Sequence, residues 1–356
     1  MKGTGTLRLY YPPSHYDAAY RGLVFPLLKP FLKWDGFSDE DRMKLYGVTE
    51  NDYTLTDNLE QADVAILPMA WNYYVERDRL ALANNFIDRC GRLQKKVLVL
   101  NAGDFGLRIP NREHLIIFRL GGYKSRFAKN EFTLPVFIED PLEQYFQTTE
   151  LHLRSYASRP FVGFCGQANS AYGNRIKETL KIAARNVKTV LGLSKNEQQQ
   201  LLSTSFLRAS VLRTLENSPR VVANFILRKK YRAGITTQRA THSTTLEFYN
   251  NLNESDYVVC VRGAGNFSVR FYEALAMGRI PVFVNTDCSL PLDHKVSWEK
   301  HLVWVPYGER SQVAEKIVTF HNQRSPEDFK DLQHQNRALW KEQLTLGGFF
   351  KSFLGE

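Results

Sequence analysis

YVVCVRGAGNFSVRFYEALAMGRIP, residues 257–281, joins an apolar run, two glycines and a helical pattern. Tyr257–Val261 are typical of a strand buried in a parallel sheet. A glycine turn between such a strand and a helix indicates an anion site. The reason is that the first N–H groups of a helix have no partner within it and carry partial positive charge.

Five residues of this turn are candidates for contacting a phosphate. Gly263 and Gly265 would allow a positive φ and close approach of the backbone, and Ser268 would cap the helix that begins at the next residue. Arg262 and Arg270 would add fixed positive charge beside the helix amides. The sequence therefore predicts a phosphate turn.

The same spacing nearly matches the glycine fingerprint of NAD-binding folds, and Asp287 follows the next apolar strand, where a ribose-binding acid belongs. However, a dinucleotide fold usually starts at its glycine turn and needs several strand and helix units after it. Little chain follows here, and two arginines suit a more concentrated charge than NAD carries. An NAD-dependent oxidoreductase is therefore the weaker alternative.

Short apolar runs alternate with helical patterns along the whole chain, which predicts an α/β fold with parallel sheets. In the first half, strands are expected at Leu7–Tyr11, Asp63–Met69, Lys96–Asn101, His114–Leu120 and Leu134–Ile138, and helices at Ala18–Trp34 and Val75–Cys90. In the second half, helices are expected to about residue 232, with strands at Phe161–Cys165, Tyr257–Val261, Ile280–Asn285 and Leu302–Val305.

The signal becomes polar and irregular after residue 140, which predicts a domain boundary near residue 150. We expect an N-terminal domain of residues 1–150, a second domain of residues 151–325, and a C-terminal helical segment of residues 326–356 that packs back on the first domain. The polar run Asn196–Gln200 is expected to be an exposed helix face.

The net charge of +10, from 47 Lys and Arg against 37 Asp and Glu, favours anionic partners. A polyanion- or nucleic-acid-binding protein is therefore an alternative, and residues 228–232 form the densest basic cluster. Such a protein would interleave basic and aromatic residues along a stripe, whereas the most specific pattern here is the glycine turn. We expect no nucleic acid partner.

Several common classes of site and location are disfavoured. The four cysteines are scattered without a C-x-x-C pair, which argues against a disulfide framework and fits a reducing compartment. The first residues lack the apolar region of a secretory signal, and no run of apolar residues is long enough for a membrane span. We expect a cytoplasmic protein whose charge would also suit peripheral contact with an anionic membrane face.

Residues 246–300 resemble the exostosin family of glycosyltransferases. The likeness rests on YVVCVRG, then SVRFYEALAMGRIPV, and then the LPLD and WE elements, in the order and spacing of the family. Residues 159–175, RPFVGFCGQANSAYGNR, are similar to a further family element more loosely. The chain departs from the pattern at Val261, where proline is usual, and at Arg279, where cysteine is common.

The resemblance implies GT-B architecture, with two Rossmann-like domains facing across a cleft. It also implies inverting, metal-independent transfer of a sugar from a nucleotide-sugar, with UDP as the expected carrier and a glycan or polysaccharide as acceptor. No cofactor is expected. The residues implied for donor binding are Gly166, Arg175, Arg262, Gly263, Gly265, Ser268, Arg270, Glu273 and Asp293.

Inversion needs a general base that takes the proton of the acceptor hydroxyl. Asp104 directly follows an apolar strand, and loops at the carboxyl ends of strands carry the active sites of α/β proteins. His15 is the second candidate, also in a loop after a strand. Each could instead be a turn or capping residue.

Asp39-Glu40-Asp41 formally matches the D-x-D metal motif of other glycosyltransferases. Ser38 precedes it, however, so these acids suit the first turn of a capped helix, and we interpret them that way. The histidines show no metal-ligand spacing, and no bound metal is expected.

Overall fold

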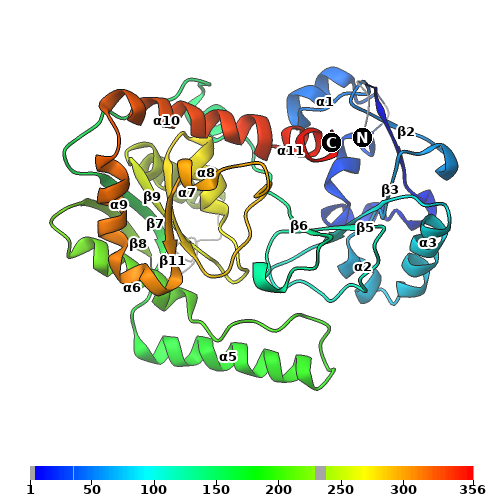
Figure 1. Cartoon of the computed structure of the whole chain (residues 1–356), viewed down its shortest axis with the longest axis horizontal. Helices are drawn as coiled ribbons and strands as arrows, with labels where there is room; N and C mark the ends of the chain where they lie inside the picture. Colours follow the sequence, from blue (N-terminus) through cyan, green and yellow to red (C-terminus); the bar gives the residue numbers. More distant parts are fainter. Residues whose placement is uncertain (1–4, 35, 229–237, 356) are drawn as a thin grey trace.

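The structure is a computed structural model that describes residues 5–34, 36–228 and 238–355. These residues form two all-parallel sheets, each with its own helices (Figure 1). The first sheet has the order β2-β1-β3-β4-β5-β6: Tyr53–Leu55, Leu7–Tyr10, Val64–Ile66, Val97–Asn101, Leu115–Arg119 and Glu131–Thr133. The second has the order β11-β10-β9-β7-β8: Val303–Pro306, Ile280–Asn285, Tyr257–Val261, Phe161–Gln167 and Val222–Arg228.

Helices connect some of the consecutive strands, and 3-10 segments or loops connect the others. The helices of the first unit are α1 Asp39–Tyr46, α2 Trp71–Glu76, α3 Leu80–Arg92 and α4 Pro141–Phe146. Those of the second unit and its extension are α5 Tyr172–Val190, α6 Thr204–Glu216, α7 Gln238–Asn253, α8 Val269–Ala276, α9 Val313–Asn322, α10 Pro326–Leu339 and α11 Leu346–Leu354. None of the helices among the described residues combines the length and apolar character needed to span a bilayer.

Strand β9 is buried on both faces. Tyr257, Val259 and Val261 join one apolar cluster, with residues of α6 and α9, while Val258 and Cys260 join another, with residues of α8. Because side chains alternate along a strand, an unbroken apolar run is what a strand covered on both faces needs. All four cysteines are buried and free.

Several expected elements of the first unit are wrong. Ala18–Trp34 is not one helix but two 3-10 segments, Ala18–Leu23 and Pro26–Phe31, because Pro26 and Pro30 lack the N–H that a continuous helix needs. Val75–Cys90 is divided between α2 and α3 by Asp78, whose φ is 54°. Leu134–Ile138 form no strand, since β6 ends at Thr133.

Two further expectations fail near the second sheet. Val222–Arg228 form β8, whereas a helix was expected there, and residues 229–232 of the basic cluster lie outside the described residues. Asn196–Gln200 are not an exposed helix face, because Gln199 is 7% exposed and accepts a hydrogen bond from Tyr123 of the first unit. Next to it, Glu197 pairs with the buried Arg119 at 2.6 Å.

The C-terminal helix crosses back to the first unit, as expected. Helix α10 lies on the second sheet, a π-helical turn at Trp340–Leu344 follows, and α11 then packs on the first unit (Figure 1). Phe349 and Phe350 are fully buried against Phe118 of β5. A Cβ on Gly347 would lie 2.2 Å from the carbonyl oxygen of Gly47, so this contact needs glycine.

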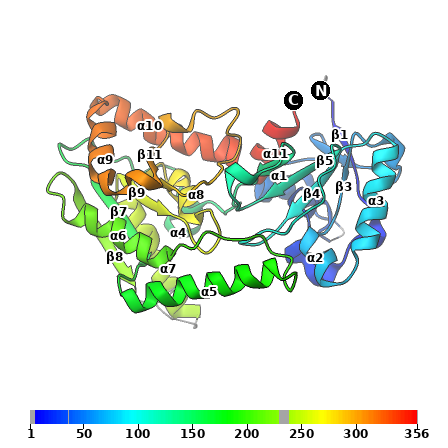
Figure 2. The same ribbon diagram turned by 60° about the horizontal axis from the view of Figure 1, so that its bottom comes forward.

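Loops after the strands of the two sheets meet between the units. Asn266, after β9, donates to the carbonyl oxygen of Gly122, after β5, at 2.8 Å. Ser125 donates to the carboxylate of Asp287, which follows β10. The carboxyl edges of two Rossmann-like sheets therefore face each other, which is the GT-B layout (Figure 2).

Candidate functional site

The glycine turn lies at the switch point of the second sheet. From β7 the chain goes first to β8 on one side and then to β9 on the other, so β7 and β9 are neighbours whose following loops diverge. Ligands of open α/β sheets bind in this kind of crevice, outside the carboxyl ends of the strands. Gln167 ends β7, and Arg262 begins the turn after β9.

Two arginines lie at this switch point, close to the carboxyl ends of β7 and β9. Arg208 of α6 donates to the carbonyl oxygens of Gln167 at 3.3 Å and Arg262 at 2.8 Å, so it joins the two diverging loops. Arg270 of α8 donates to the carbonyl oxygen of Cys165 at 2.7 Å and lies over the ring of Phe164. The Nε atoms of both arginines are buried and lack a hydrogen-bond partner within the described part of the chain.

The positive charge of this pair is only partly offset, by Glu178 near Arg208 and by Glu273 near Arg270. Neither Arg208 nor Arg270 forms an ion pair with a carboxylate among the described residues. Burial, and secondly the charge of Arg270, lowers the pKa of Arg208 to about 10. Burial also lowers the pKa of Arg270. Both shifts mean that the protonated guanidinium is disfavoured here, and a bound anion would relieve this cost.

The sequence did not single out Arg208. The spacing around Arg208 gives a weak indication of its position: it lies three, four and seven residues before Val211, Leu212 and Leu215, which are buried on α6. An arginine at a core position of an amphipathic helix must find polar partners, and here those partners are loop carbonyls.

The glycines act differently from the expectation. Neither Gly263 nor Gly265 has a positive φ, so that prediction is wrong. Close approach does occur at Gly265, where a Cβ would lie 2.9 Å from the carbonyl oxygen of Asp104. A Cβ on Gly166 would lie 2.7 Å from Nη2 of Arg270. These glycines leave room for the facing loop and for the arginine.

Arg262 holds the two units together and is not open to a ligand. It is 6% exposed and donates to the hydroxyl of Tyr123 in the first unit at 3.1 Å and to the carbonyl oxygen of Ala264 at 3.0 Å. Asn266 is likewise buried and donates across the interface. The expectation that Arg262 faces a phosphate is therefore corrected to an interface role, with Nη1 on Tyr123, Nη2 on Ala264, and Nε buried without a partner among the described residues.

Ser268 and Glu273 lie on the helix after the turn. Ser268 stands at the N-cap position of α8, but its side chain makes no capping hydrogen bond, so the expected cap is wrong in that respect. Glu273 accepts a hydrogen bond from Tyr249 at 3.1 Å, and burial raises its pKa. It forms no ion pair with Arg270, so its carboxylate keeps acceptor positions beside the arginine pair.

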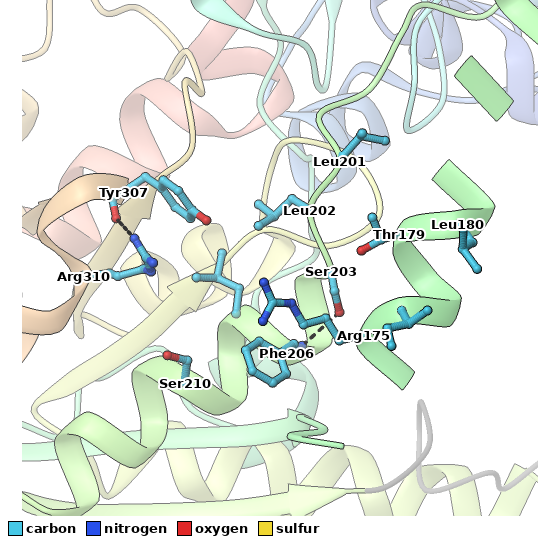
Figure 3. A pocket seen from close by; sticks show the side chains of 12 residues that line it. Arg175, Thr179, Leu180, Leu201, Leu202, Ser203, Phe206, Ser210, Tyr307 and Arg310 are labelled. Carbon is cyan, nitrogen blue, oxygen red and sulfur yellow. Dashed lines mark hydrogen bonds between the residues drawn. The ribbon is translucent and has the colours of Figure 1, made fainter. Parts of the chain in front are cut away.

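The other donor candidates lie apart from the arginine pair. Arg175 stands over the ring of Phe206 and lines a separate cavity of about 510 Å³ between α5, α6 and Tyr307 (Figure 3). None of the residues that line this cavity belongs to the glycine turn. Asp293 pairs with Lys124 of the first unit at 2.8 Å, which makes it an interface residue.

The two base candidates differ in exposure. Asp104 is exposed and follows β4, and its backbone carbonyl oxygen lies against the glycine turn, so the loop that carries Asp104 faces the second sheet across the interface. His15 is 4% exposed, with Nδ1 3.2 Å from the hydroxyl of Tyr74, and burial lowers its pKa. A histidine enclosed among aromatic rings is poorly placed to meet a sugar hydroxyl.

The residues behind the NAD and metal alternatives have structural partners. The carboxylate of Asp287 accepts from the backbone N–H of Ser125 at 3.1 Å as well as from its hydroxyl, which leaves it poorly placed for a ribose. Ser38 and Asp41 form a capping box at the start of α1, as expected. The residues that the structure describes contain no cluster of three potential His, Cys, Asp or Glu metal ligands.

No protein-family model and no curated protein matches the chain. The resemblance to the exostosin family therefore stays a prediction. Among solved structures, the chain is similar to a TarM variant of S. aureus in complex with fondaparinux, α-GlcNAc-glycerol and UDP (10% identity, TM-score 0.35). That match covers 73% of this chain and half of TarM.

The chain is also similar to a glycosyltransferase from Rickettsia africae. The identity is 9% and the TM-score 0.39, and the match covers 99% of this chain and 97% of the other. Likeness at this level does not identify site residues. The function has to be argued from the side chains of this chain.

Proposed function

We propose that the chain is a glycosyltransferase that moves a sugar from a nucleotide-sugar to a glycan acceptor, with the donor diphosphate bound by Arg208 and Arg270. The observation that carries the proposal is the pair of guanidinium groups at the switch point of the second sheet, which donate to loop carbonyls and form no ion pair with a carboxylate in the described part of the chain. Guanidinium groups suit phosphate oxygens in charge and geometry.

The chemistry follows from where charge develops. The bond between the anomeric carbon and the diphosphate oxygen breaks, and the departing diphosphate gains negative charge. Arg208, Arg270 and the first amides of α8 would stabilise that charge, as fixed cations and dipoles do most effectively in a partly buried site. This supply of positive charge supports metal-independent transfer. UDP as carrier rests on the resemblance of residues 246–300.

Glu273 supports the donor assignment from the same helix. It lies beside the arginine pair, and its second carboxylate oxygen is available to accept from a hydroxyl of the donor ribose. Arg262, Asp293 and Arg175 are not part of the proposed site, because each has the structural partners described above.

Asp104 is the proposed general base. In an inverting transfer, the acceptor oxygen forms the new bond to the anomeric carbon while its proton passes to the carboxylate. The exposed position of Asp104 after β4, opposite the glycine turn, supports this role. His15 is not proposed as the base, because its ring is buried.

The Asp104→Asn variant is expected to lower turnover about 100-fold or more, the range that a positioned base contributes. Its affinity for UDP should be unchanged, because Asp104 would contact the acceptor. Asp331→Asn, an exposed change on α10, is the control. Turnover by Asp104→Asn equal to that of the control would remove Asp104 from the mechanism.

Ligand-dependent thermal unfolding tests the proposal as a whole. UDP at 100 times its dissociation constant should stabilise the protein by about 2.7 kcal/mol, because it binds only the folded state. GDP, CMP and NAD serve as comparisons at equal concentration. An increase in unfolding temperature with NAD and none with any of the other nucleotides would contradict a glycosyltransferase. Turnover measured in the presence of EDTA tests metal independence directly.

A further inference from the structure

Helix α5 lies along the outer margin of the molecule, apart from the body of either sheet (Figures 1 and 2). It is 19 residues long and none of its side chains is buried. A helix of this length in a globular protein normally buries an apolar face against the body. Helix α5 buries no such apolar face.

The side of α5 that faces the protein is mainly polar, with the half-buried Ile182 among its polar residues. Glu178 accepts hydrogen bonds from the hydroxyls of Ser203 and Ser205 at 2.6 and 2.7 Å. Asn186 exchanges two hydrogen bonds with the backbone of Gln199. Arg185 stands over a ring of the first unit. These contacts fix the rotation of the helix about its axis.

The opposite side of α5 is apolar and exposed. At 100° per residue its exposed large apolar side chains fall in one sector: Tyr172, Ile176, Leu180, Val187, Val190 and, just after the helix, Leu191, with exposed fractions of 71%, 58%, 63%, 55%, 67% and 65%. We call these residues the α5 stripe. Ile176 and Leu180 also border the cavity between α5 and α6, so the stripe begins at the edge of that cavity and continues over the exposed surface of the helix.

Lysines border this stripe on one side. Lys177, Lys181 and Lys188 are exposed, lie in one sector next to the α5 stripe, and form no ion pair among the described residues. The one acidic residue of α5, Glu178, is turned inward to the two serines. The exposed surface of the helix thus carries apolar and positive groups without a negative one.

We propose that α5 docks on an anionic lipid membrane, with the α5 stripe in the headgroup layer and the three lysines against lipid phosphates. A helix with a wide apolar face and basic residues along its edge binds interfaces in this way, through apolar burial and attraction to anionic lipid. Repulsion between positive charges makes a second copy of the chain an unfavourable partner for the α5 stripe. A symmetric pairing of two α5 helices would set lysines near lysines with no acidic residue between them.

Vesicle co-sedimentation tests this with the full chain. The protein should pellet with phosphatidylglycerol and phosphatidylcholine vesicles and stay in the supernatant with phosphatidylcholine alone, and binding should weaken as salt rises. Replacing Lys177, Lys181 and Lys188 together by glutamate should lower partitioning by more than about tenfold. A matched variant with Lys44, Lys330 and Lys341 replaced by glutamate has the same net charge, and it should bind like the wild type.

A second pair of variants tests the apolar face. Leu180→Glu should abolish vesicle binding, whereas Leu45→Glu on α1, at 60% exposure against 63%, should not. Both positions are exposed, so both variants should fold and keep the UDP-induced thermal shift. The proposal would be overturned if the wild-type protein did not bind anionic vesicles. It would also be overturned if Leu180→Glu and Leu45→Glu reduced vesicle binding equally. So would a dimer in analytical ultracentrifugation that Leu180→Glu dissociates, since the stripe would then pair with a second copy.

Discussion

Replacing Arg208 by alanine is expected to weaken UDP binding about 10- to 100-fold, because a hydrogen bond to a charged group contributes about 1.5–3 kcal/mol. Arg208 joins the loops after β7 and β9, and its positive charge adds to that of Arg270 in the same crevice. Arg270→Ala should have a comparable effect. Isothermal titration calorimetry with UDP measures both.

Arg213→Ala is the matched control for Arg208→Ala, since Arg213 lies on the same helix but is exposed. Its affinity for UDP should equal that of the wild type. Arg208→Lys keeps the charge but not the planar fork, so it should bind with intermediate affinity. Circular dichroism confirms that each variant is folded. Unchanged UDP affinity in both Arg208→Ala and Arg270→Ala would mean that the diphosphate binds elsewhere.

Phe349→Ala is expected to destabilise the protein by about 3–5 kcal/mol, the usual cost of removing a buried aromatic ring. Phe349 is fully buried where α11 returns to the first unit, with its ring near those of Phe118, Phe137 and Phe353. The void would weaken the contact that ties the C-terminal segment to the first sheet. Chemical denaturation monitored by tryptophan fluorescence gives the change in free energy of unfolding.

Tyr172→Ala provides the comparison, because it removes an aromatic ring that is 71% exposed. Its effect on the free energy of unfolding should be within about 0.5 kcal/mol, as for most surface substitutions. If Phe349→Ala were equally mild, α11 would contribute little to holding the two units together. UDP binding by folded Phe349→Ala protein separates a loss of stability from a loss of the site.

Local patterns predicted much of the fold. The strands β9 and β10 have the expected bounds, and α8 begins at the expected residue, Val269. These elements depend on interactions between close neighbours and on burial of both faces, which leave a clear trace in the sequence. The expected helix over Ala18–Trp34 failed because two prolines override an apolar spacing that otherwise suits a helix.

The candidate site was only half predictable. Arg270 was found because it follows a recognisable strand and turn, whereas Arg208 comes from α6, far away in the chain, and shows only as a charged residue on a buried helix face. Arg262 looked equivalent to Arg270, yet its side chain is used by Tyr123. Whether an arginine meets a ligand or a loop depends on what the other unit places beside it.

By itself, the sequence determined most strands of the two parallel sheets, though not β2, β6 or β8, and also the turn after β9 and the capped start of α1, since each is set by residues adjacent in the chain. Only the tertiary structure decided that Arg208 lies near Arg270, that His15 is enclosed by aromatic rings, and that α5 leaves most of its large apolar side chains exposed. Those outcomes depend on contacts between segments remote in the chain. Such contacts are set by how the two units pack, and no local spacing encodes that packing.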